Sequence, residues 1–139
     1  MISKKTIYGL QAVLLLAKRY DHGPVLITDL AKEGRIPKKF LEAILLELRK
    51  NGILNSKKGK GGGYILGKAP QDISVGDIIR TLDGSFTEIL FEGESKETNE
   101  IKLVMKEVRD AMSNILDKTS LEDVIQRACV GQNVLNYVI

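Results

Sequence analysis

Residues 57–64, KKGKGGGY, place four glycines and three lysines within eight positions. Glycine loses more conformational freedom on folding than any other residue, and neighbouring lysines repel one another, so stability alone does not explain this composition. A phosphate-binding loop, a flexible linker and a loop that contacts nucleic acid would each use it. The residues on either side decide between these three alternatives.

Short apolar stretches, residues 53–56 and 64–66, flank the glycine-rich segment, and each is typical of a short β-strand. A P-loop requires a Ser or Thr after its lysine, and a dinucleotide-binding loop requires a final glycine where Tyr64 stands, so both are disfavoured. A linker is disfavoured as well, because strand-like residues resume directly after the loop. We therefore predict two strands joined by a loop that contacts nucleic acid.

A first amphipathic helix is predicted near the start of the chain. Ser3 can cap its N-terminus, and residues 21–24, DHGP, end it. The predicted apolar face is Ile7, Leu10, Leu14 and Ala17, with Val13 and Leu16 alongside. The single histidine, His22, falls in the turn and has no cluster of potential ligands around it in the sequence.

Two further helices are separated by a turn that contains Gly34. Thr28 is expected to cap the shorter helix, residues 29–33, and Pro37 suits the first turn of the longer one, where its missing N–H loses no hydrogen bond. The longer helix ends before Gly52. Its predicted buried stripe is Leu41, Ile44, Leu45 and Leu48.

This helix pair is either a helix-turn-helix or an αα-hairpin that only contributes to the core. The strand, glycine-rich loop and strand that follow favour the first reading, because three helices and a hairpin in this order are typical of a winged helix. After the hairpin, Ser74 and Asp77 form a predicted capping box for a fourth helix, which ends at Asp83 and Gly84. Residues 92–100, EGESKETNE, are polar and predict a loop or disordered link.

Beyond this link the apolar residues alternate in steps of four and three, the a/d spacing of a coiled coil. The predicted stripe is Ile101, Val104, Met105, Val108, Ala111, Met112, Ile115 and Leu116. With only two heptads, the stripe either meets a partner helix or packs on the chain's own core. Thr119 and Glu122 are expected to cap a last short helix, 120–128, followed by Cys129 as a small buried residue.

The composition excludes several classes of protein. One cysteine and one histidine cannot by themselves form an intramolecular disulfide, a zinc site or an iron–sulfur site, so we expect no cofactor, no bound metal and no enzymatic activity. No run of about eighteen apolar residues occurs, and the first residues, MISKKTIYGL, lack the pattern of a secretory signal. We therefore expect a cytoplasmic protein with no membrane partner.

Basic residues are concentrated in the first half of the chain. Residues 1–70 carry 14 Lys and Arg against 5 Asp and Glu, a net charge of +9, whereas residues 71–139 carry 7 against 13, a net charge of −6. A polyanion is expected to bind the basic half.

Taken together, these residues resemble the Rrf2 family of bacterial winged-helix transcriptional regulators. The wing of that family resembles SKKGKGGGYILGKAP, residues 56–70, and its recognition helix resembles IPKKFLEAILLELRKNGIL, residues 36–54. Its next helix is similar to ISVGDIIRTLDG, residues 73–84. The end of its dimerisation helix and the short helix beyond are similar to ILDKTSLEDVI, residues 115–125.

The resemblance implies a mainly α fold with a small β-hairpin wing. The expected division is a winged helix-turn-helix DNA-binding domain at 1–84, a flexible acidic loop at 85–100, and a dimerisation helix with a short terminal helix at 101–139. It implies a homodimer whose recognition helices enter successive major grooves of a pseudo-palindromic operator on double-stranded DNA, with the wings in adjacent minor grooves. The eight stripe residues from Ile101 to Leu116 would form the dimer interface.

By position, Lys39, Glu42 and Ala43 would face base edges, and Lys58 would take the place of the family's wing arginine. The expected DNA-contacting set is Thr28, Pro37, Lys38, Lys39, Glu42, Ala43, Lys57, Lys58, Lys60, Gly61, Gly62, Gly63 and Tyr64. These residue types suit the role, because lysines attract phosphate and a carboxylate can accept from the amino group of cytosine.

Two departures from the family pattern limit this expectation. Lys60 replaces the wing proline and lysine replaces arginine, which implies a more flexible wing with less bidentate discrimination. The cluster-binding members carry three cysteines where this chain, at about 85–99, has none, so a family-type iron–sulfur cluster is excluded. The effector is then an unknown small molecule, another protein or nothing at all, and a redox role for Cys129 stays open.

The leading hypothesis is a dimeric, sequence-specific transcriptional regulator, and a repressor rather than an activator. The alternative is a dimeric protein- or RNA-interaction module that uses the same basic face.

Overall fold

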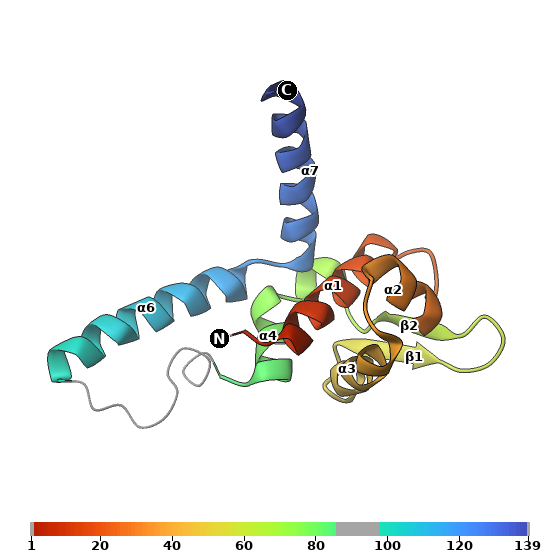
Figure 1. The fold of residues 1–139 in the computed structure, drawn as a ribbon, viewed down its shortest axis with the longest axis horizontal. Helices are drawn as coiled ribbons and strands as arrows, with labels where there is room; N and C mark the ends of the chain where they lie inside the picture. The colour runs from red at the N-terminus through yellow and green to blue at the C-terminus, as the bar shows by residue number, and fades with distance from the viewer. Residues whose placement is uncertain (1, 86–97, 139) are drawn as a thin grey trace.

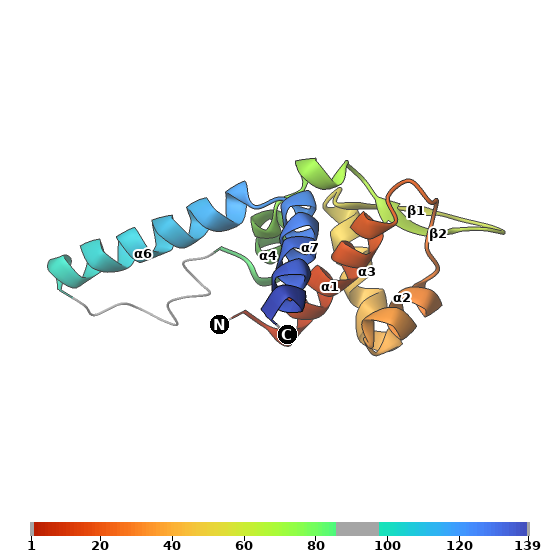
Figure 2. The same cartoon turned by 90° about the horizontal axis from the view of Figure 1, so that it is seen from above.

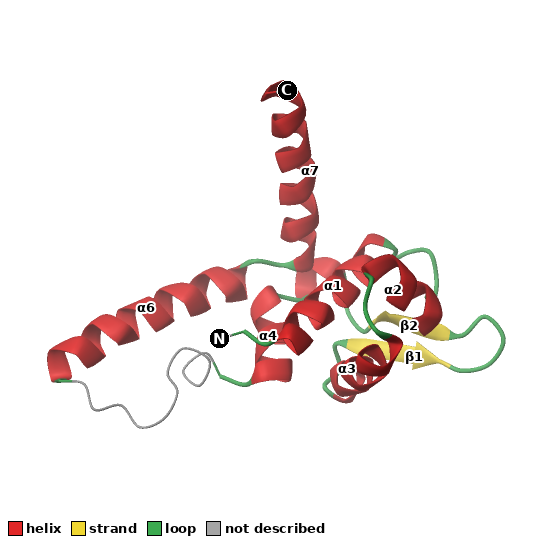
Figure 3. Cartoon of the chain, in the orientation of Figure 1, coloured by secondary structure: helices red, strands yellow, loops and turns green. Residues whose placement is uncertain are grey.

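The computed structural model describes residues 2–85 and 98–138. These residues form helices and one two-stranded antiparallel sheet, so the predicted class, mainly α with a small β-hairpin, is confirmed. Figure 1 follows the chain by colour, and Figure 3 shows the two strands in yellow at one end of the molecule.

Helix α1 (Lys4–Lys18) begins at Ser3, as predicted. The Ser3 hydroxyl accepts a hydrogen bond from the N–H of Thr6 (3.2 Å) and donates one to Asp83 (2.6 Å), whose other oxygen accepts the N–H of Ser3 (2.8 Å). The Asp83 carboxylate therefore lies at the positive N-terminus of α1. Partial burial raises the pKa of Asp83, but the hydrogen bonds from Ser3 and Thr6 lower it more, so the pKa lies below its ordinary value.

The buried face of α1 differs from the predicted one. Its buried residues are Thr6, Gly9, Ala12, Val13, Leu16 and Ala17. Ile7 is 43% exposed and Leu14 is only half-buried, so both were wrongly placed in the core stripe. The reason is close helix packing: a Cβ on Gly9 would overlap the side chain of Leu82. Small residues therefore define much of the buried face of α1, and a pattern based on large apolar side chains overlooks them.

Helix α2 (Ile27–Gly34) begins two residues earlier than predicted. Its N-cap is Leu26, without a side-chain hydrogen bond, so the predicted capping role of Thr28 is wrong. The cause is a distant contact, because Val25 pairs with Tyr64 and the chain turns into the helix directly afterwards.

Helix α3 (Lys38–Lys50) follows a short turn and completes the predicted helix-turn-helix. The left-handed residue of that turn is Arg35, with φ of 53°, and not Gly34. Pro37 is the N-cap of α3, one position before the first turn in which it was predicted. Gly52 lies just beyond the C-cap, as predicted. The predicted buried stripe is confirmed at Leu41, Ile44, Leu45 and Leu48.

Strands β1 (Leu54–Lys57) and β2 (Gly63–Leu66) pair in antiparallel register, with Leu54 opposite Leu66. Both predicted strands are confirmed to within one residue at each end. A single turn of 3-10 helix, η1 (Pro70–Asp72), then leads into α4 (Val75–Asp83).

The predicted capping box of α4 is present. The hydroxyl of Ser74 accepts the N–H of Asp77, and the carboxylate of Asp77 accepts the N–H of Ser74, both at 3.0 Å. Gly84 ends the helix, as expected. The largest side chains of the common core include Leu30, Leu41, Ile44, Leu45, Leu48, Leu54, Ile78 and Leu121.

Helices α6 (Asn99–Lys118) and α7 (Leu121–Val138) form the C-terminal part. The predicted acidic loop at 85–100 falls mostly on residues 86–97, which lie outside the described residues. Its last two residues, Asn99 and Glu100, belong to α6, so the predicted end of the loop is wrong by two residues. Leu121 is buried, so the first turn of α7 belongs to the core. Figures 1 and 2 both place α6 and the β-hairpin at opposite ends of the molecule, and α7 leads away from the body between them.

Two predictions for α7 were wrong. The capping pair is Ser120 and Asp123, one residue later than predicted, because Thr119 belongs to the end of α6 and donates to the carbonyl of Ile115 (2.6 Å). The helix also continues past the predicted end, so Cys129 lies inside it and is exposed rather than buried. None of the described helices is both long and apolar enough to cross a membrane.

Candidate nucleic-acid interface

The start of α3 presents an exposed, mostly basic surface. Lys38, Lys39, Glu42 and Ala43 are all exposed, and Lys39 and Ala43 lie one turn apart on the side opposite the buried stripe. The N-cap, Pro37, makes no side-chain hydrogen bond, so no side chain of the cap covers the first N–H groups of the helix. These N–H groups and the lysines attract phosphate, and the carboxylate of Glu42 is an acceptor for a base amino group.

Thr28 is exposed in the first turn of α2. Its hydroxyl can donate to a phosphate oxygen, which is compatible with its place in the expected DNA-contacting set.

The tip of the hairpin is a tight turn. The N–H of Gly62 donates to the carbonyl of Gly59 (2.9 Å), so Lys60 and Gly61 are the central residues. Gly61 has φ of 80°, the value that a type II turn needs at its third position. Proline is favoured at the second position of this turn, which is the place that Lys60 occupies. The turn thus forms without the proline of the family pattern.

The other glycines of the hairpin provide space. A Cβ on Gly62 would overlap the carbonyl oxygen of Lys57, and a Cβ on Gly63 would overlap the carbonyl oxygen of Val25. These glycines are therefore required by the hairpin's own packing, whether or not the loop contacts a ligand.

A contact that the sequence did not predict joins the hairpin to the helix-turn-helix. The N–H of Val25 donates to the carbonyl of Tyr64 (2.9 Å), and the N–H of Tyr64 donates to the carbonyl of Val25 (2.8 Å). Val25 thus acts as a one-residue third strand beside β2. The guanidinium of Arg49 in α3 also donates to the hydroxyl of Ser56 in β1 (3.1 Å). These contacts hold the hairpin and α3 together as one surface. The only local sign of the pairing with Tyr64 is the short apolar run at residues 25–27.

The lysines of this surface have no acidic partner among the described residues. Lys57, Lys58 and Lys60 are exposed, as are the two lysines of the first turn of α3. The ion pairs found within residues 2–85 and 98–138 use other cations: Lys5, Arg19, Arg80 and Arg109. Within this part of the chain, five positive charges are therefore left without an acidic partner.

The predicted stripe on α6 is also open to solvent. Five of its seven large residues, Ile101, Val104, Met105, Val108 and Ile115, are between 38% and 62% exposed. Ala111 is exposed, Met112 is half-buried, and Leu116 packs against Ile79 of α4. None of the residues of α6 is buried, and only the C-terminal end of the stripe packs on α4, so the chain's own core leaves most of the stripe uncovered within the described structure.

Comparisons with known proteins agree with this architecture. Over residues 2–127 the sequence matches the Rrf2 family, described as iron-dependent transcriptional regulators. It is 36% identical over 124 residues to the HTH-type transcriptional regulator CymR of Bacillus subtilis strain 168, a match that covers 88% of each chain. It is 38% identical over 84 residues to the HTH-type transcriptional regulator IscR of Escherichia coli O1:K1 / APEC, which is 60% of this chain and 52% of IscR.

The solved structure of CymR, the global cysteine regulator of B. subtilis, superposes with a TM-score of 0.83 at 35% identity. The superposition covers 91% of this chain and 97% of that one. This likeness confirms the predicted winged-helix class, and the relatives named here are transcriptional regulators rather than enzymes.

Because the family is described as iron-dependent, the residues of this chain that could bind iron are of interest. The chain has one cysteine and one histidine. Cys129 is exposed on α7 and His22 is exposed in the loop after α1. Within the part of the chain that the structure describes, no three His, Cys, Asp or Glu side chains are grouped so as to hold a metal ion. The residues present do not fit a cysteine-ligated iron–sulfur cluster.

Proposed function

The chain belongs to the Rrf2 family of transcriptional regulators, and from this premise we propose that it is a homodimeric, sequence-specific DNA-binding repressor that works without an iron–sulfur cluster. The observation that carries the proposal is the surface shared by α3 and the hairpin. It carries five exposed lysines without acidic partners in the described structure, and it is held together by the pairing of Val25 with Tyr64.

On this proposal α3 enters the major groove by its N-terminal end. Lys39 donates to guanine or phosphate, Glu42 accepts from the amino group of cytosine, and Ala43 lets the helix approach the base edges closely. Lys38 and Thr28 contact phosphates on either side. Sequence discrimination then comes mainly from α3.

The wing lies in the adjacent minor groove. Lys58 and Lys60 at its tip and Lys57 at the end of β1 neutralise phosphates, which supplies affinity but little sequence information. Lysine is a point charge without the planar fork of arginine, so this wing discriminates among grooves less than an arginine-bearing wing does.

The dimer forms through the open stripe of α6. Two such stripes facing each other would remove five large side chains per protomer from water, including Val108 and Ile115, which the isolated chain leaves exposed. A dimer with one recognition helix per half-site reads a pseudo-palindrome. Repression needs only that this dimer occupy the promoter, whereas activation needs a further surface for the polymerase.

The operator test separates this function from a basic interaction module. An operator is first selected from random duplexes on the purified protein, and its affinity is compared with that of a scrambled duplex over a range of salt concentrations. The selected duplex should bind at least about 1,000-fold more tightly than the scrambled one at moderate salt. Equal affinities at every salt concentration would refute the proposal, because phosphate contacts carry no sequence information.

The role of the wing is tested in the same assay. Replacing Lys57, Lys58 and Lys60 together by alanine should weaken binding to all sequences and reduce the log–log salt slope by up to about three charges per protomer, or about six for the dimer. The matched control replaces three exposed lysines of α6, Lys102, Lys106 and Lys118, by alanine. This change removes the same charge from a region outside the proposed DNA interface and outside the apolar stripe. A slope that falls equally in both variants would remove the wing from the contact.

A further inference from the structure

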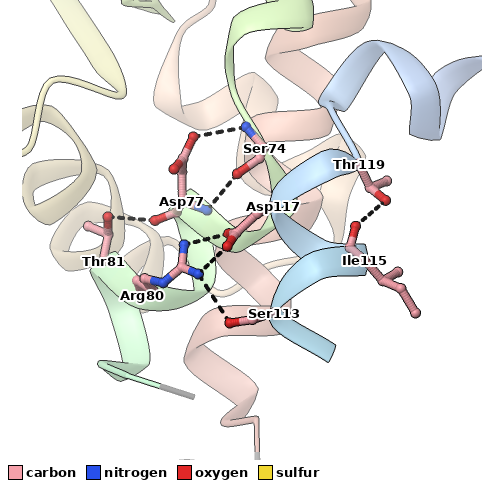
Figure 4. A network of polar contacts seen from close by, with 8 residues as sticks. All are labelled: Ser74, Asp77, Arg80, Thr81, Ser113, Ile115, Asp117 and Thr119. Atoms are coloured by element: carbon pink, nitrogen blue, oxygen red, sulfur yellow. Dashed lines mark hydrogen bonds and ion pairs between the residues drawn. The ribbon is translucent and has the colours of Figure 1, made fainter. Parts of the chain in front are cut away.

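Helix α4 and the end of α6 meet at a junction of polar groups, drawn in Figure 4. Arg80 of α4 donates two hydrogen bonds to the two carboxylate oxygens of Asp117, both at 2.5 Å, and a third group, the Ser113 hydroxyl, lies at 3.5 Å. Two parallel N–H···O bonds fix the relative orientation of the planar groups as well as their distance. The hydrogen bond with Asp117 raises the pKa of Arg80 by more than partial burial lowers it.

Two backbone hydrogen bonds fasten the chain just beyond this pair. The N–H of Val75 donates to the carbonyl of Thr119, and the N–H of Leu121 donates to the carbonyl of Ile73, both at 2.9 Å. The first turns of α4 and α7 therefore begin side by side, each with its own capping box. Leu116 packs on Ile79 next to them. A rotation of α6 relative to α4 would disturb these contacts together.

Gly76 makes room for the pair. It is buried in the first turn of α4, and a Cβ at this position would overlap the carboxylate of Asp117. Glycine is disfavoured inside a helix relative to alanine. Its presence here is explained by the space that Asp117 needs to reach Arg80.

Stability does not account for the pair. The side chains of Arg80 and Asp117 are 38% and 41% exposed, and ion pairs of such exposure contribute little to folding. The pair of Arg19 and Glu33, between α1 and α2, is almost equally exposed at 39% and 40%. The two pairs differ in what they connect, because Arg19 and Glu33 lie within the winged-helix unit, whereas Arg80 and Asp117 join that unit to α6.

We propose that Arg80, Asp117 and Gly76 are positioning residues that fix the direction of α6 relative to α3, and thereby the separation of the two recognition helices in the dimer. This inference rests on the proposed function. The path of the coupling is short: α6 contacts α4, and α4 packs directly on α3.

The length of α6 makes its direction important. Its 20 residues span about 30 Å, so a rotation of about 10° at the junction moves the far end by about 5 Å. Successive base pairs are about 3.4 Å apart along the duplex, so such a movement corresponds to one or two base pairs of half-site spacing. A loosened junction should therefore relax the choice of spacing more than the choice of sequence.

The test compares the selected operator with versions whose half-sites are one or two base pairs closer or farther apart. Wild-type protein should prefer one spacing, and Arg80→Ala should reduce that preference at least about fivefold, the lower end of typical couplings between sites. Gly76→Ala should also reduce the spacing preference, although it keeps both charges and favours the helix.

The double variant Arg80→Asp with Asp117→Arg exchanges the two charges and should restore part of the spacing preference. Arg19→Ala is the matched control, and its spacing preference should equal that of the wild type.

A second readout does not need DNA. Spin labels on cysteines introduced at positions 58 and 106, in a Cys129→Ser background diluted with unlabelled protein, report the distance between the wing and α6 within one protomer. The distribution should be narrow in wild type and Arg19→Ala, and broader in Arg80→Ala and Gly76→Ala.

The outcomes separate the two hypotheses. Unchanged spacing preference and unchanged distance distributions in both junction variants would overturn the positioning role. If wild type selects no operator, the proposed function fails, while the distance distributions still decide on the junction. Should Arg80→Ala prove unfolded by circular dichroism, Gly76→Ala alone decides, because alanine is the better helix former.

Discussion

Helices α3 and α6 carry the same kind of apolar stripe, but the stripe is buried in α3 and mostly exposed in α6. In α3 the stripe residues Leu41, Ile44, Leu45 and Leu48 are at most 1% exposed, covered by α1, α2, α4 and the hairpin. In α6 no residue is buried, although the helix is longer. The winged-helix unit buries its own stripe, whereas α6 leaves most of its stripe exposed in the described structure.

The difference shows what an amphipathic pattern establishes. Steps of three and four predict that a helix face will be covered, and they do so equally well for α3 and α6. They do not tell whether the cover comes from the same chain. Four predictions use substitutions in the two regions to test this division, from the largest expected effect to the smallest.

The largest effect is expected on the open face. Replacing Met105 and Val108 by lysine should yield a folded monomer, because four apolar side chains per dimer are lost at about 1 kcal/mol each, or roughly 1,000-fold in the dimer dissociation constant. Leu103→Lys is the control, since Leu103 is 64% exposed and lies about 200° around the helix from Met105. Sedimentation velocity measures the state, and a dimer that survives the double change would place the interface elsewhere.

On the closed side, Leu45→Ala should lower the free energy of unfolding by about 3 kcal/mol, because it leaves a cavity at a fully buried site. The adjacent Leu46 is 39% exposed on the same helix, and Leu46→Ala should change stability by less than about 0.5 kcal/mol. Urea denaturation at one fixed protein concentration gives both values. Equal losses at the two positions would contradict a closed core beneath α3.

Within the wing, Gly63→Ala should cost about 2 kcal/mol, because the added Cβ forces the Val25 backbone away from β2. Gly59 has φ of 92° with open space around it, so Gly59→Ala should cost only the local strain of about 1 kcal/mol. Hydrogen exchange at the N–H of Val25 distinguishes them. Only Gly63→Ala should accelerate it, and protected exchange in that variant would mean that the pairing tolerates a side chain.

The smallest effect concerns the Asp83 carboxylate at the start of α1. Its pKa is below the ordinary value in the folded chain, so its contribution is present above about pH 4 and is lost as the pH falls through the folded pKa. Asp83→Asn should therefore cost less than about 1 kcal/mol at pH 6, given the solvent near this group, and less still below pH 3. Thermal unfolding at both pH values measures this, and a difference independent of pH would exclude the ionised form as the cause.

Local sequence signals predicted most of the fold and much of the candidate site. The caps at Ser3 and Ser74, the stripe of α3 and the glycine-rich hairpin each depend on residues a few positions apart, and each was found. The exposed lysines of α3 and the wing were also predicted, because clustered charges rarely lie in a core.

The errors arose where residues far apart in the sequence meet. Thr28 does not cap α2 because Val25 is held by Tyr64, and Ile7 is exposed because Gly9 brings α1 close to α4. The contact of Arg80 with Asp117 spans 37 positions and left no local signal. Such contacts depend on how the elements pack against one another, and the sequence pattern within one element gives no information about that packing.

The pairing of Val25 with Tyr64 has a consequence for recombination among relatives. The proposed DNA-binding surface is not one contiguous block of sequence, since its wing is completed by a residue that precedes α2. A crossover between residues 25 and 64 would join one parent's third strand to the other's wing, whereas a crossover after Leu66 inherits both from the same parent. Exchange of DNA specificity should therefore succeed most often when the whole stretch from the loop before α2 to the end of β2 is transferred as a single cassette.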